Sequence, residues 1–243
     1  MPVDSGISRS VLAEQIKDRL LQDILSGRYP PHSRIVETRV AREVGTSQAP
    51  VREALRGLEA LGVVEILPFR GARVRRPGVQ ELLEAYAVRS ELESLGARLG
   101  IPRMTDEDLA DLEALHAAMQ VAAEAGDRHE VAIRDAAFHA RLLALAGNRT
   151  LERVWQSLEP FSRTYITLVS PGADAQWTAD LHPRILAAVR DRDPEAVVTA
   201  LRQHFDEASA HLAAGWLRDD EAAGVRPRSG GRRPANATAS ADA

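Results

Sequence analysis

The stretch that decides the fold covers residues 35–76 and reads IVETRVAREVGTSQAPVREALRGLEALGVVEILPFRGARVRR. Its first part predicts a short amphipathic helix ending at Gly45-Thr46, because apolar residues recur there with helical spacing. A second short helix follows, with Ser47 as its N-cap, Pro50 in its first turn and Gly62 just beyond its end. The apolar faces of two such helices pack together and leave the polar face of the second exposed, as in a helix-turn-helix.

That polar face carries Gln48, Arg52 and Arg56 at one-turn spacing, which suits entry into a DNA major groove. Arg52 is a candidate for guanine O6 and N7, and Gln48 for an adenine edge. Residues 63–67 and 72–75 predict the strands of a basic hairpin, or wing, for contact with phosphates. A solvated hairpin is the alternative for the wing alone, but its position after two such helices favours DNA binding. The predicted DNA-binding residues are Arg39, Ser47, Gln48, Ala49, Arg52, Arg56, Arg70, Gly71, Arg73 and Arg75.

Composition and charge set further limits. The chain has 243 residues and no cysteine, which excludes disulfides and thiolate metal sites. No apolar run approaches the roughly 18 residues of a membrane span, and no signal-peptide core is present, so we expect a cytoplasmic protein without a membrane partner. Residues 1–77 carry 13 Lys and Arg against 9 Asp and Glu, whereas residues 78–217 carry 13 against 22. Only the first, net basic part is therefore expected to meet nucleic acid.

The remaining pattern is helical. A helix at residues 10–26 completes the N-terminal module, and six more are predicted at 79–99, 106–125, 128–146, 149–169, 178–191 and 194–217. The predicted fold class is mainly α, with an N-terminal winged helix-turn-helix bearing a small β-hairpin wing and a C-terminal all-α bundle. The expected domains are a DNA-binding domain at 8–77, a helical effector-binding, metal-binding and dimerisation domain at 79–217, and a disordered tail at 218–243.

A second constellation lies in the predicted bundle. Asp135 and His139 are one helical turn apart, and His182 and His204 lie on two later helices that a short Asp193-Pro194 connection makes antiparallel neighbours. Three imidazoles and a carboxylate suit Zn²⁺, Ni²⁺, Cu²⁺ or Fe²⁺ better than Mg²⁺ or Ca²⁺. The pattern alone leaves open that each histidine is an ordinary helix residue. We expect structural roles for the other histidines, His32, His116, His129 and His211.

Residues 47–64 and 70–74 resemble the DNA-binding signature of the GntR family of transcriptional regulators. Residues 88–93, 135–139 and 182–185, with the Gly147-Asn148 turn and His204, resemble in order and spacing the FCD effector-binding domain of the FadR subfamily. The likeness spans about residues 8 to 215. One departure is Gln48, where relatives commonly carry arginine, so we expect an altered base or phosphate contact there. We likewise expect Thr38 with Arg39 to shift the basic contact that the preceding helix makes. A count of six rather than seven bundle helices favours the VanR-like branch.

The resemblance implies a metal site formed by Asp135, His139, His182 and His204, with zinc as the first candidate and Ni, Fe or Cu as others. It also implies a small carboxylate effector, which Arg89 would bind. An internal salt bridge with Glu93 is the alternative for Arg89. The expected protein is a homodimeric, ligand-responsive regulator, not an enzyme, that binds an inverted repeat in duplex DNA and represses a catabolic operon. The alternatives are a metal-dependent enzyme fused to a DNA-binding module and an architectural DNA binder with a structural metal.

Overall fold

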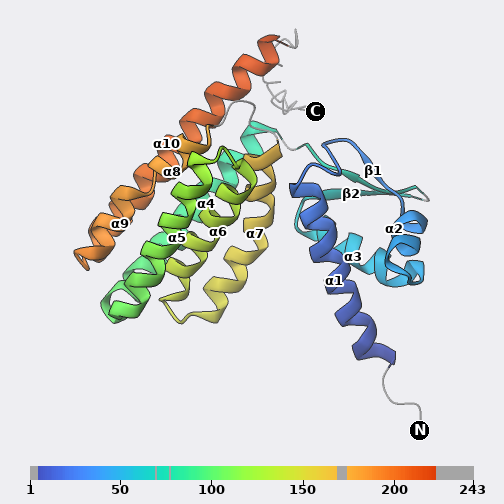
Figure 1. Cartoon of the computed structure of the whole chain (residues 1–243), viewed down its shortest axis with the longest axis horizontal. Coiled ribbons are helices and arrows are strands. Elements are labelled where there is room, and N and C mark those ends of the chain that lie inside the picture. Colours follow the sequence, from blue (N-terminus) through green and yellow to red (C-terminus); the bar gives the residue numbers. More distant parts are fainter. Residues whose placement is uncertain (1–4, 69, 77, 169–173, 223–243) are drawn as a thin grey trace, which may run out of the picture.

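The computed structural model describes residues 5–68, 70–76, 78–168 and 174–222 (Figure 1). The N-terminal module contains α1 (Ser5–Leu25), β1 (Arg34–Ile35), α2 (Glu37–Val44), α3 (Gln48–Ala60), β2 (Val64–Leu67) and β3 (Gly71–Val74). The C-terminal bundle contains α4 (Val79–Gly100), a 3-10 turn (Ile101–Arg103), α5 (Asp106–Glu124), α6 (Arg128–Ala144), α7 (Arg149–Leu168), α8 (Ala175–Asp180), α9 (Pro183–Arg190) and α10 (Pro194–Ala222). The predicted fold class, mainly α with a small wing, is confirmed.

The helix-turn-helix forms as its sequence predicts. Gly45 ends α2 in the left-handed conformation with φ 73°, Ser47 is the N-cap of α3, and Gly62 adopts φ 72° just beyond it. A left-handed backbone is the conformation that glycine adopts without steric cost, so these glycines fix where the two helices end. Val51 and Leu58 of α3 are fully buried in a core shared with α1, α2 and the sheet. Gln48, Arg52 and Arg56 on the opposite side of α3 are exposed.

The wing has one strand more than predicted. Strand β1 pairs antiparallel with β3, which gives the strand order β1-β3-β2. A two-residue strand is too short to show an alternating pattern, so the sequence carried no signal for it. Gly71 shows how tightly β1 lies here, because a Cβ at this position would overlap the carbonyl oxygen of Ile35. Strand β1 therefore ties the start of α2 to strand β3 of the wing.

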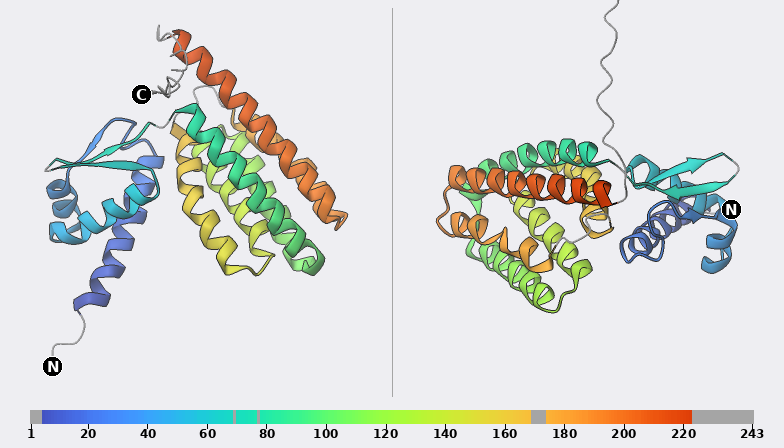
Figure 2. Two further views of the ribbon diagram at one scale, coloured as in Figure 1. Left: turned by 180° about the vertical axis from the view of Figure 1, so that it is seen from behind. Right: turned by 90° about the horizontal axis from the view of Figure 1, so that it is seen from above.

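In the bundle, α4 runs beside α10 and also contacts α6 and α7 (Figure 2). The main core lies among α5, α6, α9 and α10, where Phe138, Leu112 and Leu201 are inaccessible to solvent. The module and the bundle meet where α1 contacts α7 (Figure 1). Among the described helices, none combines the length and the apolar character that crossing a bilayer requires.

The predicted helix 178–191 is wrong as a single element, since the structure has two helices there, α8 and α9. Pro183 is the first residue of α9; it has no N–H to continue α8, and its ring would clash with the carbonyl one turn earlier. Residues 79–222, where described, thus form seven α-helices, and the six-helix count that favoured the VanR-like branch does not hold. Helix α10 also runs to Ala222, beyond the predicted end at 217. The rest of the predicted tail, 223–243, lies outside the described residues.

Candidate metal centre and DNA-facing surface

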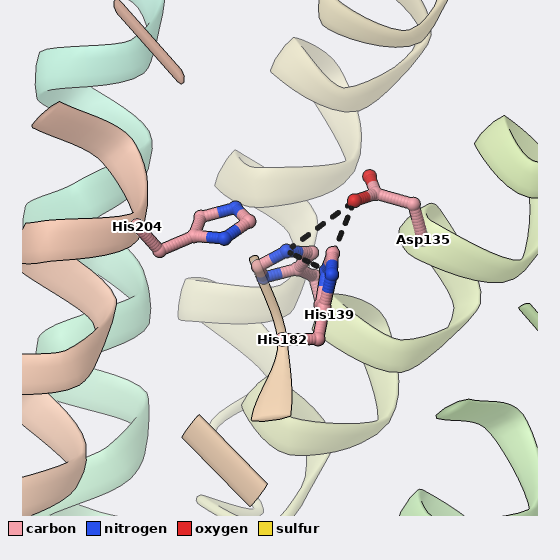
Figure 3. A group of neighbouring side chains, drawn as sticks. All are labelled: Asp135, His139, His182 and His204. Carbon is pink, nitrogen blue, oxygen red and sulfur yellow. Dashed lines mark hydrogen bonds and ion pairs between the residues drawn. The ribbon is translucent and has the colours of Figure 1, made fainter. Parts of the chain in front are cut away.

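Four buried side chains converge in the middle of the bundle (Figure 3). Asp135 and His139 come from α6, His182 is the N-cap residue of α9, and His204 comes from α10. Each offers one ligand atom, and these atoms all lie within 4.8 Å of one another. Asp135 Oδ1 is 3.1 Å from His182 Nε2 and 3.7 Å from His139 Nε2. The structure therefore brings together the four residues that the sequence singled out as metal ligands.

Two of the imidazoles are oriented by acceptors behind them. His139 Nδ1 is 2.5 Å from Glu93 Oε2, and His182 Nδ1 is 3.0 Å from the Thr178 carbonyl oxygen. Because an ionised carboxylate and a carbonyl can only accept, both Nδ1 atoms carry a proton, which leaves Nε2 of each ring as the atom that a metal would bind. Those two Nε2 atoms are 3.3 Å apart. A cation between them would satisfy both, as is usual for histidine ligands held by acceptors behind them.

The two other candidate ligands, His204 and Asp135, also fit a metal site. His204 Nδ1 is buried and has no hydrogen-bond partner among the residues that the structure describes. Burial acts to raise the pKa of Asp135, but its interactions with His182, His139 and His204 outweigh burial and hold that pKa below the usual range. Asp135 is thus an anion that accompanies three nitrogen donors. This donor set fits a divalent transition metal.

Glu93 on α4 links the centre to its surroundings. Its carboxylate accepts hydrogen bonds from Trp155 Nε1 at 2.7 Å and from Arg89 Nη2 at 3.0 Å, in addition to its contact with His139. Burial acts to raise the pKa of Glu93, but its interactions with His139 and Arg89 and the hydrogen bond from Trp155 outweigh burial and lower that pKa to about 2. Glu93 is therefore ionised, and it holds the ring of His139 in place.

Arg89 both forms a salt bridge and lines a cavity. It makes the internal salt bridge with Glu93 that was the alternative to effector binding, and both side chains are buried. It also lines a cavity that opens beside His139 and His204, between α4, α8 and α10. Burial of Arg89 acts to lower its pKa, but Glu93 and Asp135 raise the pKa above its ordinary value, so the guanidinium remains charged. A positive charge thus faces the cavity.

The predicted DNA-contacting side chains of α3 and the tip of the wing surround one surface hollow. Gln48, Arg52 and Arg56 are exposed on α3, and with Arg70 and Gly71 they line this hollow. Ser47 and Ala49 lie at the start of α3 but do not line the hollow. A basic residue missed at the sequence level joins the lining residues, since Arg34 of β1 also lines the hollow and bonds the Arg70 carbonyl oxygen at 2.7 Å.

Other arginines that were predicted to contact DNA form ion pairs with acidic side chains. Arg39 pairs with Glu43 at 3.0 Å, and Arg73 pairs with Glu65 on the neighbouring strand. Arg75 lies apart from the hollow: it donates to the Gly62 carbonyl oxygen at 3.0 Å and to Glu81 of α4 at 2.9 Å. The structure thus places Arg75 at the junction between the wing and the bundle, and its guanidinium already has partners there.

Arg52, the strongest candidate for base contact, is also paired. Its Nη2 is 2.9 Å and its Nε 3.2 Å from Glu37 Oε2, at the first position of α2. Because two nitrogens of Arg52 bond the Glu37 carboxylate, the direction of the guanidinium is already fixed in the DNA-free protein. Glu37 is a positioning residue that sequence reasoning missed, because its partner lies in the next helix.

Comparison with known protein families decides the class. Residues 12–74 match the family described as bacterial regulatory proteins, gntR family, and residues 84–207 match the FCD domain. A "Probable D-xylose utilization operon transcriptional repressor" of Paenarthrobacter nicotinovorans is 33% identical over 86% of this chain and 93% of its own length. This chain belongs to the GntR family.

Further relatives agree with the assignment of this GntR-family protein. The "Gluconate operon transcriptional repressor" of Bacillus licheniformis is 26% identical over 88% of this chain and 90% of its own length. The solved structure of E. coli McbR/YncC superposes with a TM-score of 0.71 at 24% identity, covering 84% of this chain and 98% of that one, and supports the fold. The protein is a transcriptional regulator with an FCD domain and not an enzyme, so the alternative of a metal-dependent enzyme is set aside.

The residues that sequence reasoning missed in this GntR-family regulator act through others. Glu93 and Thr178 orient metal-binding candidates, and Trp155 in turn bonds Glu93. The spacing of Arg89 and Glu93 signalled their mutual salt bridge, but no local pattern signalled that Glu93 would reach His139 on α6. Partners of this kind are fixed by how helices cross, which local spacing does not encode.

Proposed function

We propose that this GntR-family protein is a ligand-controlled repressor of a catabolic operon, and that it senses a small carboxylate at a metal site formed by Asp135, His139, His182 and His204. The observation that carries the proposal is the convergence of these four buried donors beside a cavity that Arg89 also lines. Zinc is the first candidate, and Ni, Fe and Cu remain alternatives. When bound, the ion supplies positive charge and a coordination position for a carboxylate oxygen.

The chain's own residues would bind and orient the effector. Glu93 and the Thr178 carbonyl hold two imidazoles in the tautomer that a metal requires. Arg89 keeps its positive charge at the cavity wall and has a further nitrogen, Nη1, beyond the two that bond Glu93. A carboxylate that enters beside the cluster would therefore meet a cation on more than one side.

On the DNA side, we propose a homodimer that reads an inverted repeat, with one α3 in each of two successive major grooves. Arg52 and Gln48 would contact base edges, while Arg56, Arg34 and the wing residue Arg70 would hold phosphates. Their placement around one hollow supports this assignment. Val88, Leu95 and Leu99 share one face of α4 and are 37% to 48% exposed, which supports an apolar contact with a second copy.

Helix α4 offers a physical connection between effector binding and DNA binding. Its first turn carries Glu81, which pairs with Arg75 of the DNA-binding module, and its middle carries Arg89 and Glu93. A ligand that moves Arg89 changes the position of α4 against its neighbours, and the Arg75–Glu81 ion pair transmits this to the wing. The relatives named as repressors of a D-xylose utilization operon and of a gluconate operon support a role in carbon catabolism.

The test combines metal analysis, ligand binding and DNA binding on the full-length protein. Thermal unfolding is measured with a panel of small organic acids, before and after chelation, and each stabilising acid is then added to the complex with a duplex selected from a random pool. We expect at least one acid to raise Tm only in the metal-loaded protein and to weaken its affinity for that duplex. Metal-independent binding of every hit would contradict a metal-site sensor. Absence of any response, with metal bound, would favour an architectural DNA binder with a structural metal.

A further inference from the structure

We infer that the effector is a carboxylate with an apolar body, one whose carbon chain or ring carries few hydroxyl groups beyond the position next to the carboxylate. The inference rests on the proposed function and narrows it. It comes from the walls of the cavity beside the four metal-binding candidates, which are formed by α4, α8, α10 and the residues that follow α8.

The inner walls are hydrocarbon. Leu181, Phe205 and Leu212 are each less than 10% exposed, and they pack with Tyr86 and Ala208 in one apolar cluster. Tyr86 and Phe205 meet edge to face, with ring centroids 5.6 Å apart. A hydrocarbon group against these side chains leaves water at no cost in hydrogen bonds, whereas a hydroxyl group there loses its water and must find a partner in the wall.

Polar partners for such hydroxyls are few, because most of the wall surface that faces the cavity is apolar and two of its polar side chains have other bonds. The Thr178 hydroxyl donates to the Asp174 carbonyl oxygen at 3.3 Å, and Arg89 commits Nε and Nη2 to Glu93. The other charged groups that line the described cavity belong to the candidate metal centre, which would receive the carboxylate end of the ligand. The charged groups are thus concentrated at one end. Beyond it, the polar atoms of the lining are those of the Tyr86 hydroxyl and of the Trp177 and His211 rings, and the rest of the wall is apolar.

The outer wall is an aromatic pair. Trp177 of α8 and His211 of α10 stack with ring centroids 3.9 Å apart and an interplanar angle of 20°. Both are partly exposed, while the residues beneath them are buried, so the pair lies at the mouth of the cavity. The free space inside is ≈ 30 Å³, which is room for about one or two water molecules. A ligand body must therefore part this pair and lie against its aromatic faces, which again favours hydrocarbon.

Two six-carbon acids make a matched test. 2-Hydroxyhexanoate and gluconate have the same carboxylate, 2-hydroxyl group and chain length, and they differ only in the four outer hydroxyl groups. Binding to the zinc-loaded, full-length protein is measured by titration calorimetry. We expect 2-hydroxyhexanoate to bind at least ~10-fold more tightly, since each buried hydroxyl without a partner costs binding free energy.

Variants locate the effect in the cavity. Trp177→Ala should weaken binding of 2-hydroxyhexanoate at least ~5-fold by removing part of the wall, with zinc content unchanged. His129→Ala on α6, away from the cavity, is the control and should bind the acid as the wild type does. If Trp177→Ala does not fold, His211→Ala removes the other half of the stacked pair and serves the same purpose.

The outcomes distinguish the apolar character of the effector from the proposed carboxylate sensing at a metal site. Tighter binding of 2-hydroxyhexanoate that depends on Trp177 or His211 supports an apolar effector. Equal or tighter binding of gluconate, with metal dependence and release of DNA, would overturn the inference and leave carboxylate sensing intact. Failure of both acids and of the wider organic-acid panel to bind metal-loaded protein would overturn the proposed function, and the inference with it.

Discussion

Glu93 on α4 and His139 on α6 face each other through a 2.5 Å contact between Oε2 and Nδ1, and both side chains are about 1% exposed. The carboxylate is the acceptor that fixes the proton on Nδ1 and leaves Nε2 directed at Asp135 and His182. Since Glu93 also holds Arg89 and Trp155, one side chain orients a candidate metal ligand and the cationic wall of the cavity together.

Glu93→Gln should weaken zinc affinity about 10- to 100-fold, because the neutral amide is a poorer acceptor for His139 and loses the charge that raises its basicity. Glutamine still accepts hydrogen bonds, so we expect the fold to persist. Competition with a chromophoric chelator measures the affinity. The control is Glu91→Gln, an exposed position on the same helix that pairs with Arg202. Equal zinc affinity in wild type and Glu93→Gln would exclude the orienting role.

Removal of the metal should lower stability. At a zinc concentration one hundred times Kd, linkage predicts about 2.7 kcal/mol of stabilisation against unfolding, provided that the unfolded chain does not bind zinc. His204→Ala deletes one candidate ligand and should remove most of this gain, whereas His211→Ala, outside the four-residue cluster, should keep it. Chemical denaturation with and without chelator gives the values. A gain of equal size in His204→Ala would show that His204 is not a ligand.

Arg52→Ala should reduce the affinity for the selected duplex by about 1–3 kcal/mol and relax the preference at one base pair. Arg202→Ala in the bundle is the control for loss of a positive charge remote from α3. Affinity is measured on a set of duplexes with single base-pair changes. A uniform loss over all duplexes would mean that Arg52 contacts only phosphate.

Glu37→Ala should lower base discrimination without removing a DNA contact, because Arg52 then loses the carboxylate that directs its guanidinium. The affinity for random duplex should rise, since a negative charge at the hollow is removed. The ratio of specific to non-specific affinity at fixed salt is the quantity to measure. A ratio equal to that of the wild type would show that Glu37 does not position Arg52.

Arg75→Ala and Arg70→Ala should change different properties of DNA binding. Arg70 is exposed at the hollow, so its loss should reduce the slope of log affinity against log salt by about 1. Arg75 bonds Gly62 and Glu81, so its loss should leave the salt slope unchanged and weaken the effect of a bound acid on DNA affinity. A change of salt slope in Arg75→Ala would instead place this arginine on phosphate.

The start of α5 should make stability depend on pH in the acid range. The Thr105 backbone N–H, Arg141 and the Thr105 hydroxyl all bond Asp108 and lower its pKa from 3.8 to about 2. A depressed carboxyl pKa stabilises the fold above about pH 4, and this contribution is lost as the pH falls towards 2. Asp108→Asn should therefore flatten the unfolding free energy between pH 4 and 2, measured by urea denaturation. An unchanged pH slope would argue against this capping interaction.

Much of this architecture is local and was open to prediction from sequence. Gly45, Ser47 and Gly62 mark helix ends through backbone conformation and capping, which depend on neighbours in the chain. Asp135 and His139 share a helical face because of their spacing alone. Their meeting with His182 and His204 followed from the order of helices and the resemblance to a family.

Only the tertiary structure decided which side chains those elements bring into contact. Strand β1 exists through its pairing with β3, Glu93 reaches His139, and Arg75 turns from the wing towards Glu81. Such contacts depend on the rotation and crossing of whole helices. Helical periodicity fixes a residue's face relative to its own axis, but packing of the complete core fixes what that face meets.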